Sequence, residues 1–354
     1  MKIAIYDPYL DALGGGEKYM MTAAEALSQH HEVTILWDHE NDIEKVEDRF
    51  GLDLSKTKIS HNIFSSQVSA FQRLQKTKDY DVLLYLSDGS IPVVRCKLVI
   101  HFQFPIEWIT VNWKTKFKLR RVSTIITNSL FTKKFVDRKL RVNSTVVYPP
   151  VSLKHTDTPK ENIILHVGRF MKTGVEGSDY KKQYFMIDVF KELVDQGLKD
   201  WKFVIAASVR TNDLSDFQKM QSAAAGYPIS FIVNATNDDL SKIYNQTKIY
   251  WHASGFGEDL EVHPEKAEHF GISTVEAMSA GAVPIVINAG GQKEIVKNKE
   301  NGLLWDTREE LISQTTTVIN DQKQLHKYSE AALHSAAKFS KETFNEKILS
   351  LVTK

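Results

Sequence analysis

Short apolar runs alternate with helical patterns along most of this chain of 354 residues, in two successive series. In the first series, strands are predicted at residues 2–6, 32–37, 82–86, 97–102 and 124–127. A helix with one apolar stripe is predicted at residues 16–29, directly after the first strand. Because parallel strands need a crossover connection that is usually a helix, the alternation predicts an α/β class with parallel, doubly wound sheets.

The second series predicts a second sheet of the same kind. Its strands are expected at residues 163–167, 203–207, 230–233, 249–252 and 284–287. Its helices are expected near residues 181–196, 214–225 and 238–246. The polar segment 152–161 follows Pro149 and Pro150 and reads as a linker between domains. We therefore predict one domain at 1–150 and a second at 151–339.

The final stretch, residues 331–352, is predicted to be helical, with Phe339, Phe344, Ile348 and Leu351 as apolar anchors. Composition agrees with a soluble two-domain protein, with 42% hydrophobic and 25% charged residues. The net charge of +1 argues against a dedicated nucleic-acid binder. Cys96 is the only cysteine, the amino terminus reads as a strand rather than a signal peptide, and no apolar run reaches 18 residues. A cytoplasmic location is expected.

Two glutamates, Glu268 and Glu276, stand eight residues apart around a turn that opens a helix. The turn is formed by Gly271, Ile272, Ser273 and Thr274. A helix amino terminus offers unpaired N–H groups that suit a phosphate, and an ionised carboxylate accepts hydrogen bonds from sugar or ribose hydroxyls. The pattern favours a clamp for a sugar nucleotide, with Glu268 on the donor sugar and Glu276 on the ribose. A plain amphipathic helix with two solvated glutamates is the alternative.

Two further segments carry groups suited to phosphate. Gly14, Gly15 and Gly16 follow the first strand, where glycine lets the backbone approach a ligand closely, although a plain tight turn is the alternative. Arg169 ends a predicted strand, and an arginine can bind phosphate oxygens bidentately. The next helix opens with lysines at residues 181 and 182. We expect Lys181 to meet a diphosphate, while Lys182 and Lys172 remain open as candidates.

His101 ends a predicted strand of the first domain, where a histidine could bind a sugar hydroxyl or carry a proton. Taken together, the run from Glu268 to Gly281, the strand after it and the Gly290-Gly291 turn resemble the C-terminal half of family 4 glycosyltransferases of the GT-B fold. The Gly168-Arg169-Phe170 run with a later lysine, and His101 upstream of Pro105, are similar to family patterns.

The resemblance implies two Rossmann-like domains that face a cleft, with the last helix, about residues 340–354, crossing back to the first domain. It implies a nucleotide-diphosphate sugar as donor, an acceptor glycan and retention of anomeric configuration. Gly15 and Gly16 would lie near the donor phosphate, and His101 would face the donor sugar. We expect catalytic roles for His101 and Glu268.

No Asp-x-Asp pair occurs, so we expect no metal and no cofactor beyond the donor substrate. The basic tract at residues 113–141 interleaves aromatic and cationic side chains, which suits an anionic membrane or a lipid-linked acceptor; a solvated face and nucleic acid are the alternatives. Two other functions stay open: a non-catalytic sugar-nucleotide or glycan-binding protein, and an epimerase or phosphorylase of the same fold.

Overall fold

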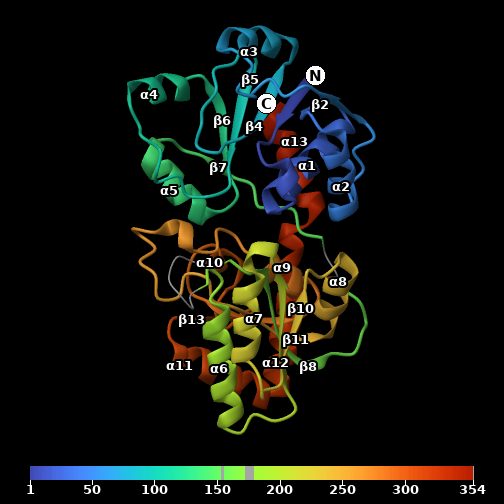
Figure 1. Cartoon of the computed structure of the whole chain (residues 1–354), viewed down its shortest axis with the longest axis vertical. Coiled ribbons are helices and arrows are strands. Elements are labelled where there is room, and N and C mark those ends of the chain that lie inside the picture. Colours follow the sequence, from blue (N-terminus) through green and yellow to red (C-terminus); the bar gives the residue numbers. More distant parts are fainter. Residues whose placement is uncertain (153–154, 172–178, 354) are drawn as a thin grey trace. The chain divides into compact units, whose positions relative to one another are not determined.

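The computed structural model describes residues 1–152, 155–171 and 179–353. The chain divides into two compact units (Figure 1). The first unit comprises Met1–Pro150 with Phe339–Lys354, and the second comprises Val151–Lys338. Each unit contains one sheet in which every paired strand is parallel to its neighbour. The prediction of doubly wound parallel sheets is confirmed.

The first sheet has seven strands in the order β3-β2-β1-β4-β5-β6-β7. These are β1 (Lys2–Tyr6), β2 (Glu32–Leu36), β3 (Thr57–Ser60), β4 (Val82–Leu86), β5 (Lys97–Phe102), β6 (Val122–Thr127) and β7 (Thr145–Val146). Its helices are α1 (Gly15–Ser28), α2 (Glu40–Phe50), α3 (Ala70–Lys76), α4 (Trp113–Leu119), α5 (Leu130–Leu140) and α13 (Lys341–Thr353).

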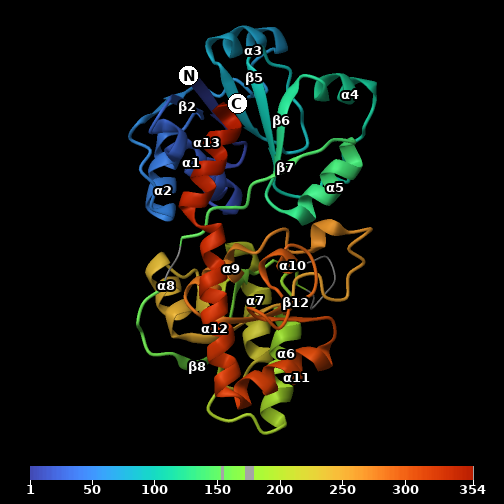
Figure 2. The ribbon, with the colours of Figure 1, turned by 180° about the vertical axis from the view of Figure 1, so that it is seen from behind.

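Alternating strand residues bury the two faces of this sheet separately. In β1, Ile3 and Ile5 join a core with α1, α2 and α13, while Ala4 and Tyr6 join a second core with α5 and the loops. The period of two places successive side chains on opposite faces, so a strand covered on both sides is apolar throughout. Figure 2 shows α13 beside α1, where Phe344 packs edge-on against Tyr19.

The carboxyl-terminal region contains two helices rather than one continuous helix over residues 331–352. α12 (Gln322–Ala336) ends before a short 3₁₀ turn (Ala337–Phe339), and α13 begins at Lys341. The Thr343 amide donates to the Ser340 hydroxyl at 3.3 Å, as at a helix amino terminus. This cap starts a new helix, α13, so the helical stretch predicted over residues 331–352 contains the end of α12, a short turn and most of α13.

The second sheet has six strands in the order β10-β9-β8-β11-β12-β13. These are β8 (Glu161–Arg169), β9 (Lys202–Ser208), β10 (Ile229–Val233), β11 (Thr247–His252), β12 (Val283–Ile287) and β13 (Leu303–Trp305). The helices of this unit are α6 (Gln183–Asp195), α7 (Leu214–Ala223), α8 (Asn237–Gln246), α9 (Ile272–Ser279), α10 (Gln292–Ile295), α11 (Arg308–Asn320) and α12. Its core is rich in aromatic side chains, among them Trp251, Trp305 and Phe190.

Candidate active site

The strand order of the second sheet reverses between β8 and β11. In open α/β sheets, ligands bind at the carboxyl ends of the strands beside such a switch point. β8 ends at Arg169 and β11 ends at His252, and the two strands are direct neighbours. Arg169, which the sequence assigns to phosphate binding, therefore ends a strand at the place where this fold favours a ligand.

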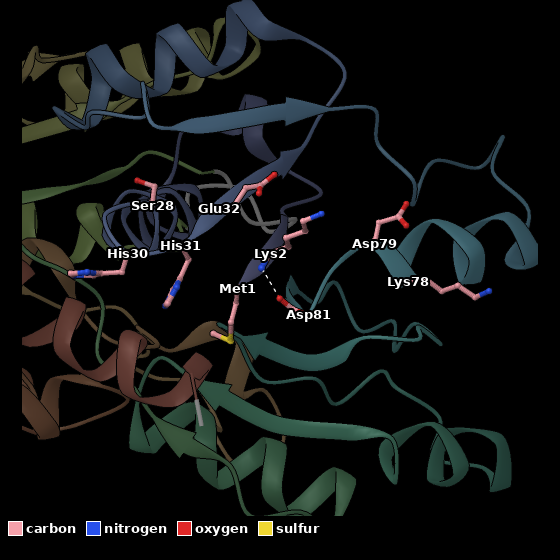
Figure 3. Close-up of a pocket in the computed structure, with 9 residues that line it drawn as sticks. All are labelled: Met1, Lys2, Ser28, His30, His31, Glu32, Lys78, Asp79 and Asp81. Atoms are coloured by element: carbon pink, nitrogen blue, oxygen red, sulfur yellow. Dashed lines mark hydrogen bonds between the residues drawn. The ribbon is translucent and has the colours of Figure 1, made fainter.

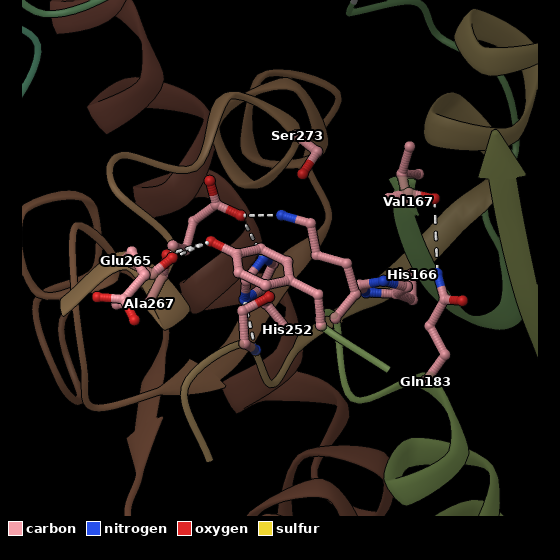
Figure 4. Close-up of polar contacts among 12 residues, drawn as sticks. His166, Val167, Gln183, His252, Glu265, Ala267 and Ser273 are labelled. Carbon is pink, nitrogen blue, oxygen red and sulfur yellow. Dashed lines mark hydrogen bonds and ion pairs between the residues drawn. The ribbon is translucent and has the colours of Figure 1, made fainter. Parts of the chain in front are cut away.

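One oxygen of the Glu268 carboxylate is held by two donors, of which His252 is labelled in Figure 4. Lys181 Nζ lies 2.5 Å from Glu268 Oε2, and His252 Nε2 lies 3.0 Å from the same atom. These residues come from the segment just before α6, the loop before α9 and the end of β11, so only the folded chain brings them together. The sequence associated Lys181 and Glu268 with one ligand, and the structure shows that they also contact each other.

Electrostatics favour the charged form of Glu268. Burial by itself raises the pKa of this carboxyl, but the Lys181 ammonium and the hydrogen bond with His252 outweigh burial and hold the pKa well below its usual range. The same burial lowers the pKa of His252. At neutral pH Glu268 is therefore a carboxylate and His252 a neutral imidazole.

Helix α9 begins immediately after Gly271, whose φ of 118° lies in the left-handed region that favours glycine. A Cβ at this position would meet the Gln292 side-chain nitrogen at 2.7 Å, so the site also lacks room for a larger residue. The N–H groups of Ile272 and Ser273 are the first of the helix and have no acceptor within it. The turn thus presents the backbone donors that a phosphate requires.

Glu276 lies one turn into α9 and is half-buried. The Tyr244 hydroxyl donates to Glu276 Oε2 at 3.1 Å, and the Tyr250 hydroxyl donates to Ser273 Oγ at 2.8 Å. Both tyrosines are buried in the second unit. These tyrosines were not predicted as site residues, because Tyr244 lies in the mostly polar α8 and Tyr250 lies within β11, neither in a recognisable motif.

The lysines at the start of α6 have different partners. Lys181 pairs with Glu268, whereas Lys182, at a φ of 57°, pairs with Glu258 at 2.6 Å. Lys172 lies outside the described residues. The helix begins at Gln183 rather than Lys181, because the Asp179 carboxylate accepts the Gln183 and Tyr184 N–H groups at 2.7 and 3.1 Å.

Tyr180 connects this segment to the loop before α9. Its hydroxyl lies 2.8 Å from the carbonyl oxygens of both Glu265 and Ala267. The contact ties the backbone on the amino-terminal side of Lys181 to the backbone on the amino-terminal side of Glu268. This arrangement explains how a lysine and a glutamate 87 positions apart keep one geometry.

In the first unit, His101 lies near the carboxyl end of β5 and is fully buried. Its ring stacks on Tyr19 with centroids 4.0 Å apart, and neither ring nitrogen has a hydrogen-bond partner among the described residues. Burial lowers the pKa of His101 to about 3, so the ring is neutral at physiological pH. Contact with a sugar stays a prediction, and the enclosure disfavours proton transfer through this ring.

Gly15 and Gly16 form the first turn of α1. A Cβ on Gly16 would meet the Gln103 side chain at 2.2 Å, so this glycine makes room for Gln103. The Glu17 carboxylate accepts the Gly14 N–H at 2.5 Å. Close packing and a capped helix account for this sequence, while contact with a donor phosphate stays a prediction.

A buried carboxyl group at the end of β1 was not identified from the sequence. Asp7 is 2% exposed, and burial, followed by the charge of Glu17, raises its pKa to about 8. Asp7 Oδ1 accepts the Tyr9 N–H, whereas Oδ2 has no partner among the described residues. The sequence could have indicated Asp7 as a site residue, because an acidic residue there directly follows an apolar strand. The carboxyl edge of such a sheet is where ligands bind.

An open hollow of about 850 Å³ in the first unit lies at the opposite edge of the sheet (Figure 3). Its lining includes Lys2 and Glu32, the first residues of β1 and β2. Because the amino ends of parallel strands are not the ligand edge of this fold, we assign no site to it.

Within the described ranges, no group of three or more His, Cys, Asp or Glu side chains is arranged to hold a metal ion. Over the same ranges, every helix is too short or too polar to cross a membrane.

The chain was compared with known proteins. Solved structures with the same fold include the HepE protein of Anabaena in complex with UDP and glucose, at 18% identity and a TM-score of 0.74, covering 100% of this chain and 99% of that one. Sucrose-phosphate synthase of Thermosynechococcus elongatus matches at 14% identity and a TM-score of 0.71, covering 99% of this chain and 98% of that one. These likenesses confirm the predicted GT-B architecture.

Curated relatives are distant. A GDP-Man:Man(3)GlcNAc(2)-PP-Dol alpha-1,2-mannosyltransferase of Dictyostelium discoideum is 23% identical over 58% of this chain and 41% of its own length. The match thus spans less than half of that relative. A Campylobacter jejuni GalNAc-alpha-(1->4)-GalNAc-alpha-(1->3)-diNAcBac-PP-undecaprenol alpha-1,4-N-acetyl-D-galactosaminyltransferase is 24% identical over 91% of this chain and 90% of its own length.

Two family descriptions cover most of the chain. "Glycosyltransferase Family 4" matches residues 13–155, and "Glycosyl transferases group 1" matches residues 152–335. The group 1 match contains Arg169, Lys181, Glu268 and Glu276, whereas Gly15, Gly16 and His101 lie in the family 4 match. The chain therefore belongs to the group 1, family 4 glycosyltransferases of the GT-B fold.

Proposed function

We propose that this protein transfers a sugar from a nucleotide-diphosphate donor to an acceptor hydroxyl with retention of anomeric configuration. The observation that carries the proposal is the Lys181–Glu268–His252 cluster at the switch point of the second sheet. Arg169, Lys181 and the N–H groups of residues 271–274 would hold the diphosphate. Glu268 would bind the donor sugar, and Glu276 the ribose.

Retention by same-face attack is favoured because the carboxylates described at this edge already have partners. Glu268 contacts Lys181 and His252, Glu258 contacts Lys182 and Lys266, and Asp179 caps α6. A double displacement needs a nucleophilic carboxylate and a second acid about 5 Å apart. In the proposed step, the bond from the anomeric carbon to the diphosphate breaks as the acceptor oxygen attacks from the same side. The acceptor proton passes to the leaving phosphate oxygen.

Donor identity can be tested by thermal unfolding with UDP-glucose, GDP-mannose, UDP and GDP. The HepE structures contain UDP or UDP-glucose, and the Dictyostelium relative is named for GDP-mannose. A ligand at 100 times its dissociation constant adds about 2.7 kcal/mol to the free energy of unfolding. A clear rise in melting temperature with one base identifies the donor. Binding without release of nucleoside diphosphate in the presence of acceptors would favour a non-catalytic binding protein.

Replacing Glu276 by alanine is expected to weaken binding of the free nucleoside diphosphate by about 10- to 100-fold, because a hydrogen bond to a charged group is worth about 1.5–3 kcal/mol. Isothermal titration measures the change. Tyr244→Phe is the matched control, since it removes only the hydroxyl that contacts Glu276. Unchanged affinity in Glu276→Ala would exclude this glutamate from the nucleotide site.

Transfer is expected to continue in EDTA, because Arg169, Lys181 and the start of α9 supply positive charge to the diphosphate. Initial rates should be measured after dialysis against chelator, with and without added magnesium or manganese. A rate that vanishes in EDTA and returns with either ion would show that these groups are insufficient.

We further propose that the acceptor is lipid-linked and that α4 contacts an anionic membrane surface. Trp113 and Phe117 on α4 are 73% and 56% exposed. Cations of α5 already form ion pairs within the protein: Lys133 pairs with Asp137, and Arg138 and Lys139 pair with Glu107. The membrane contact predicted for residues 113–141 is therefore narrowed to α4. The Campylobacter relative, which matches over most of both chains, is named for an undecaprenol-diphosphate glycan.

Binding to vesicles is expected to require acidic lipid and to weaken steeply with salt, since each cation near such a surface contributes about 1 kcal/mol. Co-sedimentation with neutral and acidic liposomes at low and high salt measures this. Lys114→Glu with Lys116→Glu should abolish it. Lys323→Glu with Lys327→Glu makes the same charge change on α12 and should not. Equal recovery in the supernatant under all conditions would leave α4 as a solvated face.

A further inference from the structure

The tautomer of His252 follows from its two contacts. The Ser254 N–H donates to His252 Nδ1 at 3.4 Å, so Nδ1 acts as an acceptor. The proton of the neutral ring is then on Nε2, which lies 3.0 Å from Glu268 Oε2. His252 therefore donates a hydrogen bond to Glu268 without adding a positive charge beside it.

The two donors occupy one oxygen of Glu268 and leave the other oxygen available. A carboxylate oxygen accepts about two hydrogen bonds, and Oε2 already receives one from His252 and one from Lys181. Oε1 has no hydrogen bond among the described contacts, and the side chain is 19% exposed. One face of the carboxylate is therefore held by the protein, and the other can accept from a ligand.

The surroundings prevent the His252 ring from turning away. The side chain is 1% exposed, and the ring of His166 lies 5.8 Å from it, centroid to centroid. His166 has a 3.0 Å contact of its own, between its Nδ1 and the Trp251 carbonyl oxygen. The ionisable groups that interact with the Lys181–Glu268–His252 cluster include His166, His269, Tyr180 and Tyr250.

We infer that His252 is a positioning residue for the proposed transfer reaction: it fixes the rotamer of Glu268 so that Oε1 faces the hydroxyl groups of the donor sugar. The inference is argued from the His252–Glu268 contact, and its effect on sugar transfer rests on the proposed function. The Lys181 side chain is 16% exposed and is also the proposed partner of the diphosphate, whereas the His252 side chain is 1% exposed and contacts Glu268 from the core. His252 is therefore the contact that keeps Glu268 oriented through the reaction.

A double-mutant cycle tests whether His252 acts through Glu268. His252→Leu should lower the rate of UDP or GDP release from UDP-glucose or GDP-mannose by about 10- to 100-fold, since a displacement of about 1 Å can cost that much. His252→Gln, which keeps an N–H donor, should recover most of the rate. The affinity for free UDP or GDP should stay within about twofold in both variants.

In the Glu268→Ala background, which has no side-chain acceptor for the His252 N–H, His252→Leu should change the rate by less than about twofold, because coupled residues are not additive. The same double-mutant cycle can be measured without turnover, as the ratio of the affinity for the nucleotide sugar to the affinity for the nucleoside diphosphate in each variant. Additive losses in both readings would overturn the inference. Equal losses in the leucine and glutamine variants, with a lower melting temperature in each, would show that His252 is only structural.

A spectroscopic measurement is independent of turnover. Nitrogen-15 spectra of the histidine side chains should show His252 as the neutral Nε2–H tautomer from pH 6 to 8, assigned by its loss in His252→Gln. The Nε2 resonance should shift in Glu268→Gln. A charged ring at pH 7, or the Nδ1–H tautomer, would overturn the inference even if the protein is a transferase. If no nucleotide sugar binds but the tautomer is as expected, the proposed function fails and the His252–Glu268 contact stands.

Discussion

Replacing Glu268 by alanine is expected to lower the rate of sugar transfer by about 100- to 1,000-fold, the usual cost of removing one preorganised group that stabilises a transition state. The substitution removes the proposed acceptor for the donor-sugar hydroxyls. It also leaves Lys181 and His252 without their shared partner. Steady-state release of nucleoside diphosphate measures the loss, and binding of free UDP or GDP should be little affected.

Glu265→Ala is the matched control for this experiment. Glu265 lies three residues earlier, its side chain is 49% exposed and it pairs only with His263 among the described ion pairs. The Tyr180 hydroxyl contacts its backbone carbonyl, which the substitution keeps. Equal rates of sugar transfer in Glu268→Ala and Glu265→Ala would show that Glu268 has no part in the mechanism.

Replacing Gly291 by alanine is expected to destabilise the second unit and to abolish nucleotide binding. A Cβ at Gly291 would lie 2.4 Å from Phe270 Cα and 2.5 Å from the His269 carbonyl oxygen, which are backbone atoms. The Gly291 N–H also donates to the Glu268 carbonyl at 2.8 Å. Relief of the clash must move the segment that carries Glu268 and starts α9. Overpacking of this kind costs about 1–3 kcal/mol or more.

Backbone strain does not contribute to the expected effect of Gly291→Ala. Its φ of −70° suits any residue, so the whole expected loss comes from the clash. Gly226→Ala is a control for backbone strain without a clash, because Gly226 has a φ of 83° and no atom within 4 Å of its Cβ position. Urea unfolding should show a loss of stability in both variants, whereas titration with UDP or GDP should show a loss of affinity only in Gly291→Ala. Wild-type affinity in that variant would show that the segment before α9 is not part of the nucleotide site.

The strands were the most predictable part of the fold. β1, β4 and β5 have the bounds expected from the sequence, because parallel strands buried on both faces are continuous apolar runs. β3 was not predicted, since at the sheet edge its residues are alternately half-buried and exposed. β7 and β13 have two and three residues, too few for a pattern. Several helices were missed, among them α2, in which most residues are polar and only Ile43 and Val46 are buried.

The predicted site residues fall into two groups. Arg169, Lys181, Glu268, Glu276 and the turn at residues 271–274 lie in the second unit, at or beside the carboxyl edge of its sheet. Gly15, Gly16 and His101 lie in the first unit, where packing against Gln103 and Tyr19 accounts for Gly16 and His101 without a ligand. Their part in the reaction stays a prediction.

The sequence by itself determined the two series of parallel strands and the strand ends at which polar groups appear. Both are local properties, since apolar period and turn chemistry act over a few neighbouring residues. Only the tertiary structure decided which side chains meet. Lys181 and Glu268 are 87 positions apart, and His252 and Glu268 are 16 apart. Contact at those separations depends on strand order, on the loop tied by Tyr180 and on buried rotamers, which no local pattern specifies.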